Sequence, residues 1–144
     1  MVSTMFRLSV LLGLAGMGLG IAMGIRQDFA LAPAHAHLNL LGFVALFLAA
    51  LYYRAVPEAG SGWLAKVQGS LAMAGAILFP VGIACVTLGD HERFMPVVVA
   101  GSLVVFVAMA LFAFIVFRTS GAKQKASIRS LSGSTPIRAP GVSL

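Results

Sequence analysis

Three histidines, His35, His37 and His91, are the residues of this sequence best suited to bind a metal ion. Imidazole nitrogen is a common protein ligand of haem iron, copper and zinc. His35 and His37 stand at the start of a long apolar run, whereas His91 lies between Asp90 and Glu92 in a short polar segment. An ionisable residue inside a membrane span is expected to serve a function. We therefore expect any metal or haem chemistry of this chain to centre on these histidines.

The spacing of His35 and His37 separates their side chains. Residues two positions apart on an α-helix point about 200° apart, so both face one bundle interior only if the helix begins between them. His37 lies deeper in the run, in one stripe with Leu41, Val44 and Leu48. The alternative is that these histidines are interfacial residues that bond water and lipid headgroups. His37 is therefore the first candidate ligand.

Four apolar stretches must position these histidines. The chain has 144 residues, of which 60% are hydrophobic and only 10% are charged, whereas soluble domains carry about 25% charged residues. A spanning helix needs about 20 mostly apolar residues, and residues 5–25, 35–53, 66–88 and 95–117 meet that requirement. The sequence predicts an all-α integral membrane four-helix bundle in residues 1–118, followed by a disordered basic tail in residues 119–144.

The first stretch has an alternative interpretation. Arg7, the apolar run and Ala30-Leu31-Ala32 resemble a signal peptide with its cleavage site. The run is about 18 residues long, whereas a signal core usually has about 7–15. We expect a retained span.

The basic residues indicate the orientation of the bundle. With the N-terminus in the cytoplasm, eight basic residues lie inside and two outside: Arg7, Arg54, Lys66, Arg118, Lys123, Lys125, Arg129 and Arg138 against Arg26 and Arg93. The positive-inside rule favours this arrangement. Both termini are therefore predicted to be cytoplasmic, and the histidines to lie on the periplasmic side of a bacterial inner membrane. The net charge of +6 then indicates topology and not nucleic-acid binding.

Gly16, Gly20 and Gly24 recur every four residues in the first stretch. Small residues at this spacing let helix backbones approach closely in lipid. Plain helix packing is the simpler interpretation, and the alternative is that a flat cofactor lies against the face that includes Gly20.

One segment resembles a known family. The run His37-Leu38-Asn39-Leu40-Leu41-Gly42-Phe43, continued by Tyr52-Tyr53-Arg54-Ala55-Val56-Pro57, resembles part of the catalytic subunit I of haem–copper oxidases, and is most similar to cbb-type oxidases and nitric oxide reductases. The wider pattern resembles short four-span bacterial proteins described as cytochrome c oxidase-like. The resemblance implies that His37 is an axial ligand of a b-type haem, and that Asn39 and Gly42 match further positions of the motif.

The chain also departs from that family, whose catalytic subunit has more spans and more metal-binding histidines. With three histidines, this chain alone does not carry the ligands of a complete terminal oxidase site. The resemblance implies that the second haem ligand is His91 or His35, a methionine such as Met23 or Met95, or a residue of a second copy of the chain.

The sequence thus favours a haem b-binding membrane protein that serves respiratory electron transfer, gas sensing or an accessory role in a respiratory complex. A first alternative is copper handling at the periplasmic face by the three histidines, with Met95 adding a sulfur ligand that suits copper. A second alternative is a cofactor-free structural or assembly subunit. A homo-oligomer or other respiratory subunits are the expected partners. Whether the protein is an enzyme stays open.

Overall fold

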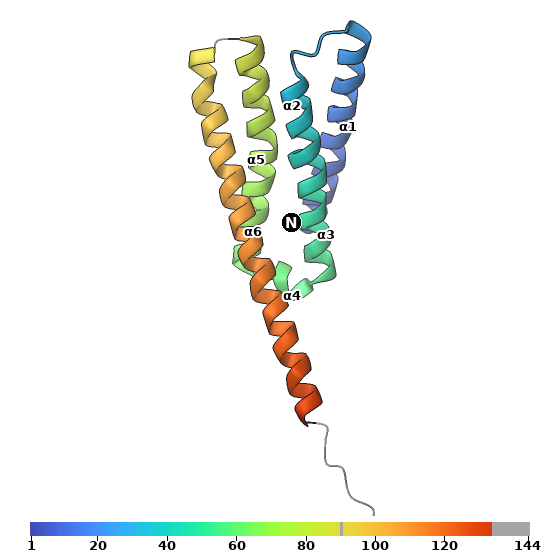
Figure 1. The fold of residues 1–144 in the computed structure, drawn as a ribbon, viewed down its shortest axis with the longest axis vertical. Helices are drawn as coiled ribbons and strands as arrows, with labels where there is room; N and C mark the ends of the chain where they lie inside the picture. The colour runs from blue at the N-terminus through green and yellow to red at the C-terminus, as the bar shows by residue number, and fades with distance from the viewer. Residues whose placement is uncertain (90, 134–144) are drawn as a thin grey trace, which may run out of the picture.

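All regular secondary structure in the described part of the chain is helical in the computed structural model, which describes the backbone of residues 1–89 and 91–133 and the side chains of residues 1–89 and 91–120 (Figure 1). Along the chain the elements are α1 (Val2–Arg26), α2 (Ala32–His37), the π-helix η1 (Leu38–Ala45), α3 (Leu46–Ala55), α4 (Pro57–Gly60), α5 (Trp63–Leu88) and α6 (His91–Gly133). The predicted all-α class is confirmed.

Four helical segments are long and apolar enough to cross a bilayer: Val2–Arg26, Ala32–Ala55, Trp63–Leu88 and His91–Ser120. The second of these, called the second span below, consists of α2, η1 and α3 joined end to end. Each segment contains one of the four predicted stretches and extends it by a few residues at one or both ends. The four expected spans are therefore confirmed.

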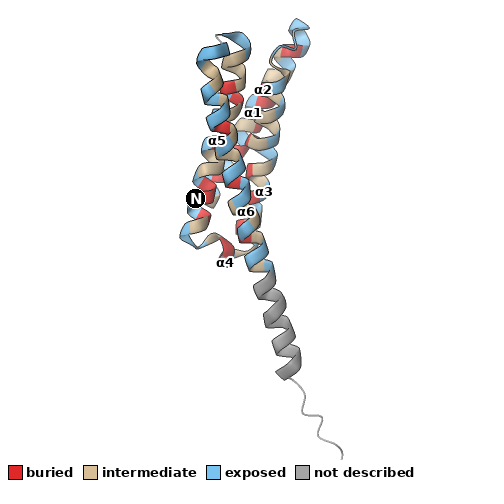
Figure 2. Ribbon diagram, turned by 60° about the vertical axis from the view of Figure 1, so that its left-hand side comes forward, coloured by how far each residue is buried: buried red, intermediate tan, exposed pale blue. Residues whose placement is uncertain are grey.

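Exposed residues occur along every span (Figure 2), and many of them are large and apolar. Ile25, Trp63 and Phe117 are 79%, 74% and 78% exposed. In water such a surface would be costly, whereas in a bilayer it meets hydrocarbon, and a helix satisfies its own backbone hydrogen bonds there. The chain is a multi-span membrane protein that lies in a lipid bilayer.

The helices associate as two antiparallel pairs, α1 with the second span and α5 with α6 (Figure 1). Glycines bring α5 and α6 close together. A Cβ atom on Gly101 would lie 2.9 Å from the Cα atom of Phe79, and one on Gly75 would lie 2.7 Å from a methyl group of Val105. Only hydrogen fits at such approaches, as expected for helix packing through small residues in lipid.

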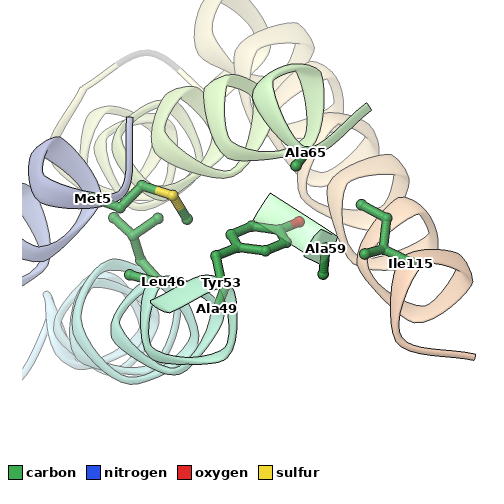
Figure 3. Close-up of a cluster of buried hydrophobic side chains, with 8 residues drawn as sticks. Met5, Leu46, Ala49, Tyr53, Ala59, Ala65 and Ile115 are labelled. Atoms are coloured by element: carbon green, nitrogen blue, oxygen red, sulfur yellow. The ribbon is translucent and has the colours of Figure 1, made fainter. Parts of the chain in front are cut away.

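The main buried apolar cluster lies toward the end of the bundle that carries α4 (Figure 3). The Tyr53 ring projects from α3 into this cluster. Met5 of α1, Ala59 of α4, Ala65 of α5 and Ile115 of α6 belong to the same cluster. This cluster joins all four spans, and toward the opposite end the second span stays in contact with α5 through α2.

The last helix is longer than the predicted span. We expected the helix to stop near residue 117, but the backbone of α6 continues as helix to Gly133. Residues 134–144 lie outside the described residues. The predicted disorder of the basic tail, and with it the domain boundary at residue 118, stays a prediction.

Candidate functional site

The segment that carries the histidine motif has unusual helical geometry. Eight consecutive residues, Leu38–Ala45, form a π-helix directly after His37. A π-helix has i→i+5 hydrogen bonds, is rare beyond a single turn, and is frequent at functional sites. The sequence predicted a regular α-helix here, so the π-helix is a difference that the structure reveals within the segment of interest.

His35 faces α1. Its Nδ1 atom lies 2.8 Å from the carbonyl oxygen of Gly16, and because a carbonyl oxygen only accepts, Nδ1 is the donor. A Cβ atom on Gly20 would lie 2.8 Å from the Cε1 atom of His35 and within 4 Å of both ring nitrogens. The absence of a side chain at Gly20 therefore makes room for the imidazole. His35 bridges the first and second spans through an interhelical hydrogen bond.

Asn39 and Gly42 continue the same contact along η1. The Asn39 amide nitrogen donates to the carbonyl oxygen of His35 at 3.0 Å, and a Cβ atom on Gly16 would lie 2.6 Å from the Asn39 amide. Gly42 is buried, and a Cβ atom there would meet Leu12 of α1 at 3.0 Å. The described contacts of both residues thus belong to the packing of α1 against the second span.

His37 points elsewhere. Its ring lies edge-on against the ring of Phe79 in α5, with 4.8 Å between ring centroids. Its Nδ1 atom is 2.8 Å from the carbonyl oxygen of Pro33 and must donate to it. The neutral imidazole then carries its lone pair on Nε2, in the tautomer that a metal ligand needs. As the two-residue spacing predicts, His35 and His37 face different neighbours.

His91 begins α6 and is exposed. It lines a shallow surface hollow with Glu92, Met95 and Pro96 of the same helix. Among the side chains of residues 1–89 and 91–120, no group of three His, Cys, Asp or Glu residues is arranged to hold a metal ion. Within this described part of the chain, His35, His37 and His91 therefore do not come together as a set of three.

A lateral crevice lies between the second span, α5 and α6. It has a volume of about 290 Å³ and apolar walls that include Leu41, Val44 and Leu48, the residues predicted to share a stripe with His37. Gln68 of α5 is a polar residue in its lining. The crevice is therefore an apolar space on the side of the second span that faces away from the glycines of α1.

Sequence reasoning missed the buried polar contacts around Gln68. Tyr53 donates its hydroxyl hydrogen to Gln68 Oε1 at 2.9 Å, and Gln68 Nε2 donates to the carbonyl oxygen of Ala108 at 3.3 Å. The side chain of Gln68 is only 3% exposed. The signal that could have revealed this network is a lone polar residue, Gln68, inside an apolar stretch. The network ties α3, α5 and α6 together.

Comparison with known proteins gives no relative from which to transfer a function. No protein-family model, curated protein or solved structure matches this chain. The relation of the segment around His37 to haem–copper oxidases stays a prediction from that segment.

Proposed function

We propose that this membrane protein binds haem b, with Nε2 of His37 as one axial ligand of the iron. The observation that carries the proposal is the hydrogen bond from His37 Nδ1 to the Pro33 carbonyl oxygen at 2.8 Å. Such a bond fixes the tautomer and the ring orientation and raises the basicity of the ligating nitrogen. The resemblance of the segment that begins at His37 to oxidase subunit I also supports it.

The surroundings of His37 suit a single axial ligand. The Phe79 ring limits rotation of the imidazole. The neighbouring His35 is held against α1 by Gly16, which fixes the start of the second span and hence the position of His37. The crevice along the same span has apolar walls, which suit the edge of a haem in a bilayer. Bound haem would supply one-electron redox chemistry.

The proposed physiological roles differ in what would occupy the second ligand position of the iron. Electron transfer is served by a second protein ligand, from this chain or from a neighbouring subunit. Gas sensing needs a position that a diatomic gas can occupy. Since His91 is exposed on α6 and the His35 ring packs against Gly20 of α1, we propose that a single chain supplies one histidine ligand.

A reduced-minus-oxidised absorption spectrum with metal analysis of the same detergent-purified sample tests the proposal. We expect a b-type spectrum that is lost in His37→Ala and kept in His91→Ala, which changes an exposed histidine. A shift of the reduced spectrum under carbon monoxide would identify an exchangeable position. An unchanged spectrum in His37→Ala contradicts the assignment of His37. Copper without haem would favour the copper alternative, and a sample without metal the cofactor-free one.

A further inference from the structure

A second candidate site lies at the other end of the bundle from the histidines. A surface hollow of about 540 Å³ opens between the start of α1 and the end of α3. The residues that line it come from the first two spans and from the start of α4: Val2, Ser3, Phe6, Arg7, Tyr53, Arg54 and Pro57. The hollow thus combines aromatic and apolar walls with two basic side chains.

The charged side chains that line this hollow are all basic. Among the described residues that line it, Arg7 and Arg54 carry guanidinium groups and none carries a carboxylate. Both arginines are exposed, and they come from different spans, so the fold and not the local sequence brings them to one hollow. A guanidinium binds phosphate oxygens through two parallel N–H donors. Two such groups at one hollow favour an anionic phosphate ligand.

Exposed apolar side chains lie near each of the two arginines along its helix, on the side of the arginine that lies toward the middle of the bilayer. Leu11 and Leu14 follow Arg7 by four and seven residues, on the same face of α1, and are 62% and 57% exposed. Leu51 precedes Arg54 by three residues on α3 and is 46% exposed. A ligand with a phosphate at the hollow and hydrocarbon chains along these residues matches both parts of the surface.

We propose that this hollow is a binding site for the headgroup of an anionic glycerophospholipid. The phosphodiester lies between Arg7 and Arg54, and an acyl chain follows Leu11 and Leu14. The site lies at the end of the bundle that the basic residues assign to the cytoplasm, where the leaflet carries anionic lipids that attract basic side chains. The site would anchor the first span against the second at the bilayer surface, independently of any haem.

Native mass spectrometry of the full chain in detergent, titrated with phosphatidylglycerol or phosphatidylcholine, tests this site. We expect saturable binding of phosphatidylglycerol and about thirtyfold weaker binding in the double variant Arg7→Gln/Arg54→Gln. The matched control Lys66→Gln/Arg118→Gln removes the same charge at the same end of the bundle, outside the lining of the hollow. It should weaken binding by less than about threefold.

A charge-conserving variant and a competing free anion complete the test of the lipid site. Arg7→Lys/Arg54→Lys keeps the charge and should retain an intermediate affinity, which also guards against a misfolded glutamine variant. Equal losses in the glutamine double variant and its control, or equal binding of phosphatidylcholine, would overturn the site. Displacement of phosphatidylglycerol by millimolar inorganic phosphate would show a free-anion site and overturn the assignment to a lipid.

Discussion

Three side chains at four-residue intervals along the second span each lie against a glycine of the first: His35 on Gly20, Asn39 on Gly16 and Phe43 on Gly13. The glycine repeat read from the sequence is thereby explained for the most part by helix packing. Gly24 belongs to the repeat, yet a Cβ atom there would have no neighbour within 4 Å. At the residue scale, the glycines make room for polar and aromatic side chains that a Cβ atom would displace.

Gly16→Ala should lower the free energy of unfolding in mixed micelles by about 1–3 kcal/mol. The new methyl group would displace the Asn39 amide, which then loses its hydrogen bond to the His35 carbonyl oxygen. Gly18→Ala is the matched control, because nothing lies within 4 Å of its Cβ position. The control should leave the stability unchanged or raise it by up to about 1 kcal/mol. Equal destabilisation by both changes would contradict the proposed contact.

Tyr53→Phe should lower the free energy of unfolding by about 0.6–1.7 kcal/mol, between the average and the maximum found for interhelical hydrogen bonds by double-mutant cycles in a membrane protein. The change leaves Gln68 Oε1 without its donor in a buried site. A double-mutant cycle with Gln68→Leu isolates the bond, and its coupling energy should account for most of the loss. Independent, additive effects of the two changes would mean that the hydroxyl stabilises the core in another way.

At the scale of elements, η1 explains how three polar and aromatic side chains share one face. An α-helix advances about 40° beyond a full turn over four residues, so residues four apart drift around the helix. A π-helix, with its i→i+5 hydrogen bonds, is wound more widely than an α-helix, so that four residues stop short of a full turn. The step from His35 to Asn39, which begins in α2, and the π-helical step from Asn39 to Phe43 therefore compensate each other, and the face stays turned to α1.

Deleting Leu40 should destabilise the bundle little more than Leu40→Ala. Leu40 is 58% exposed, so its side chain contributes little to packing. Removing one residue lets the π-helix relax to an α-helix, in which the seven steps from His35 to Phe43 add up to about 700°, within about 20° of two full turns. His35 and Phe43 then still both face α1. Thermal melting of the detergent-purified variants measures the difference, and a much lower melting temperature for the deletion than for Leu40→Ala would contradict this role of η1.

The sequence predicted the four spans but did not predict the π-helix within the second span. Hydropathy predicted four spans, because crossing a bilayer demands length and apolarity that a single sequence displays. Two-residue spacing predicted that His35 and His37 diverge. Neither pattern distinguishes η1 from an α-helix, because the choice depends on contacts with α1. The partners of Gln68 were also hidden, since Tyr53 and Ala108 lie on other helices.

At the scale of the whole molecule, four antiparallel spans place the start of the first span and the end of the fourth span on the same side of the membrane. The predicted orientation puts eight basic residues on that side and two on the other. Single cysteines in a Cys85→Ala background test this prediction. We expect cysteines at Ser3 and Ser61 to be protected from an impermeant thiol reagent in intact cells, and one at Phe29 to react. The reverse pattern would contradict the orientation and move the histidines to the cytoplasmic side.

The central claim, that His37 binds the iron of haem b, is tested most directly by restoring its imidazole as a free molecule. We expect His37→Gly, purified with ample haem, to lack the b-type spectrum of the wild type and to regain it when imidazole is added. The free imidazole occupies the space beside Phe79 that the side chain leaves. A wild-type spectrum in His37→Gly before imidazole is added, or no haem in the wild type, would contradict the claim.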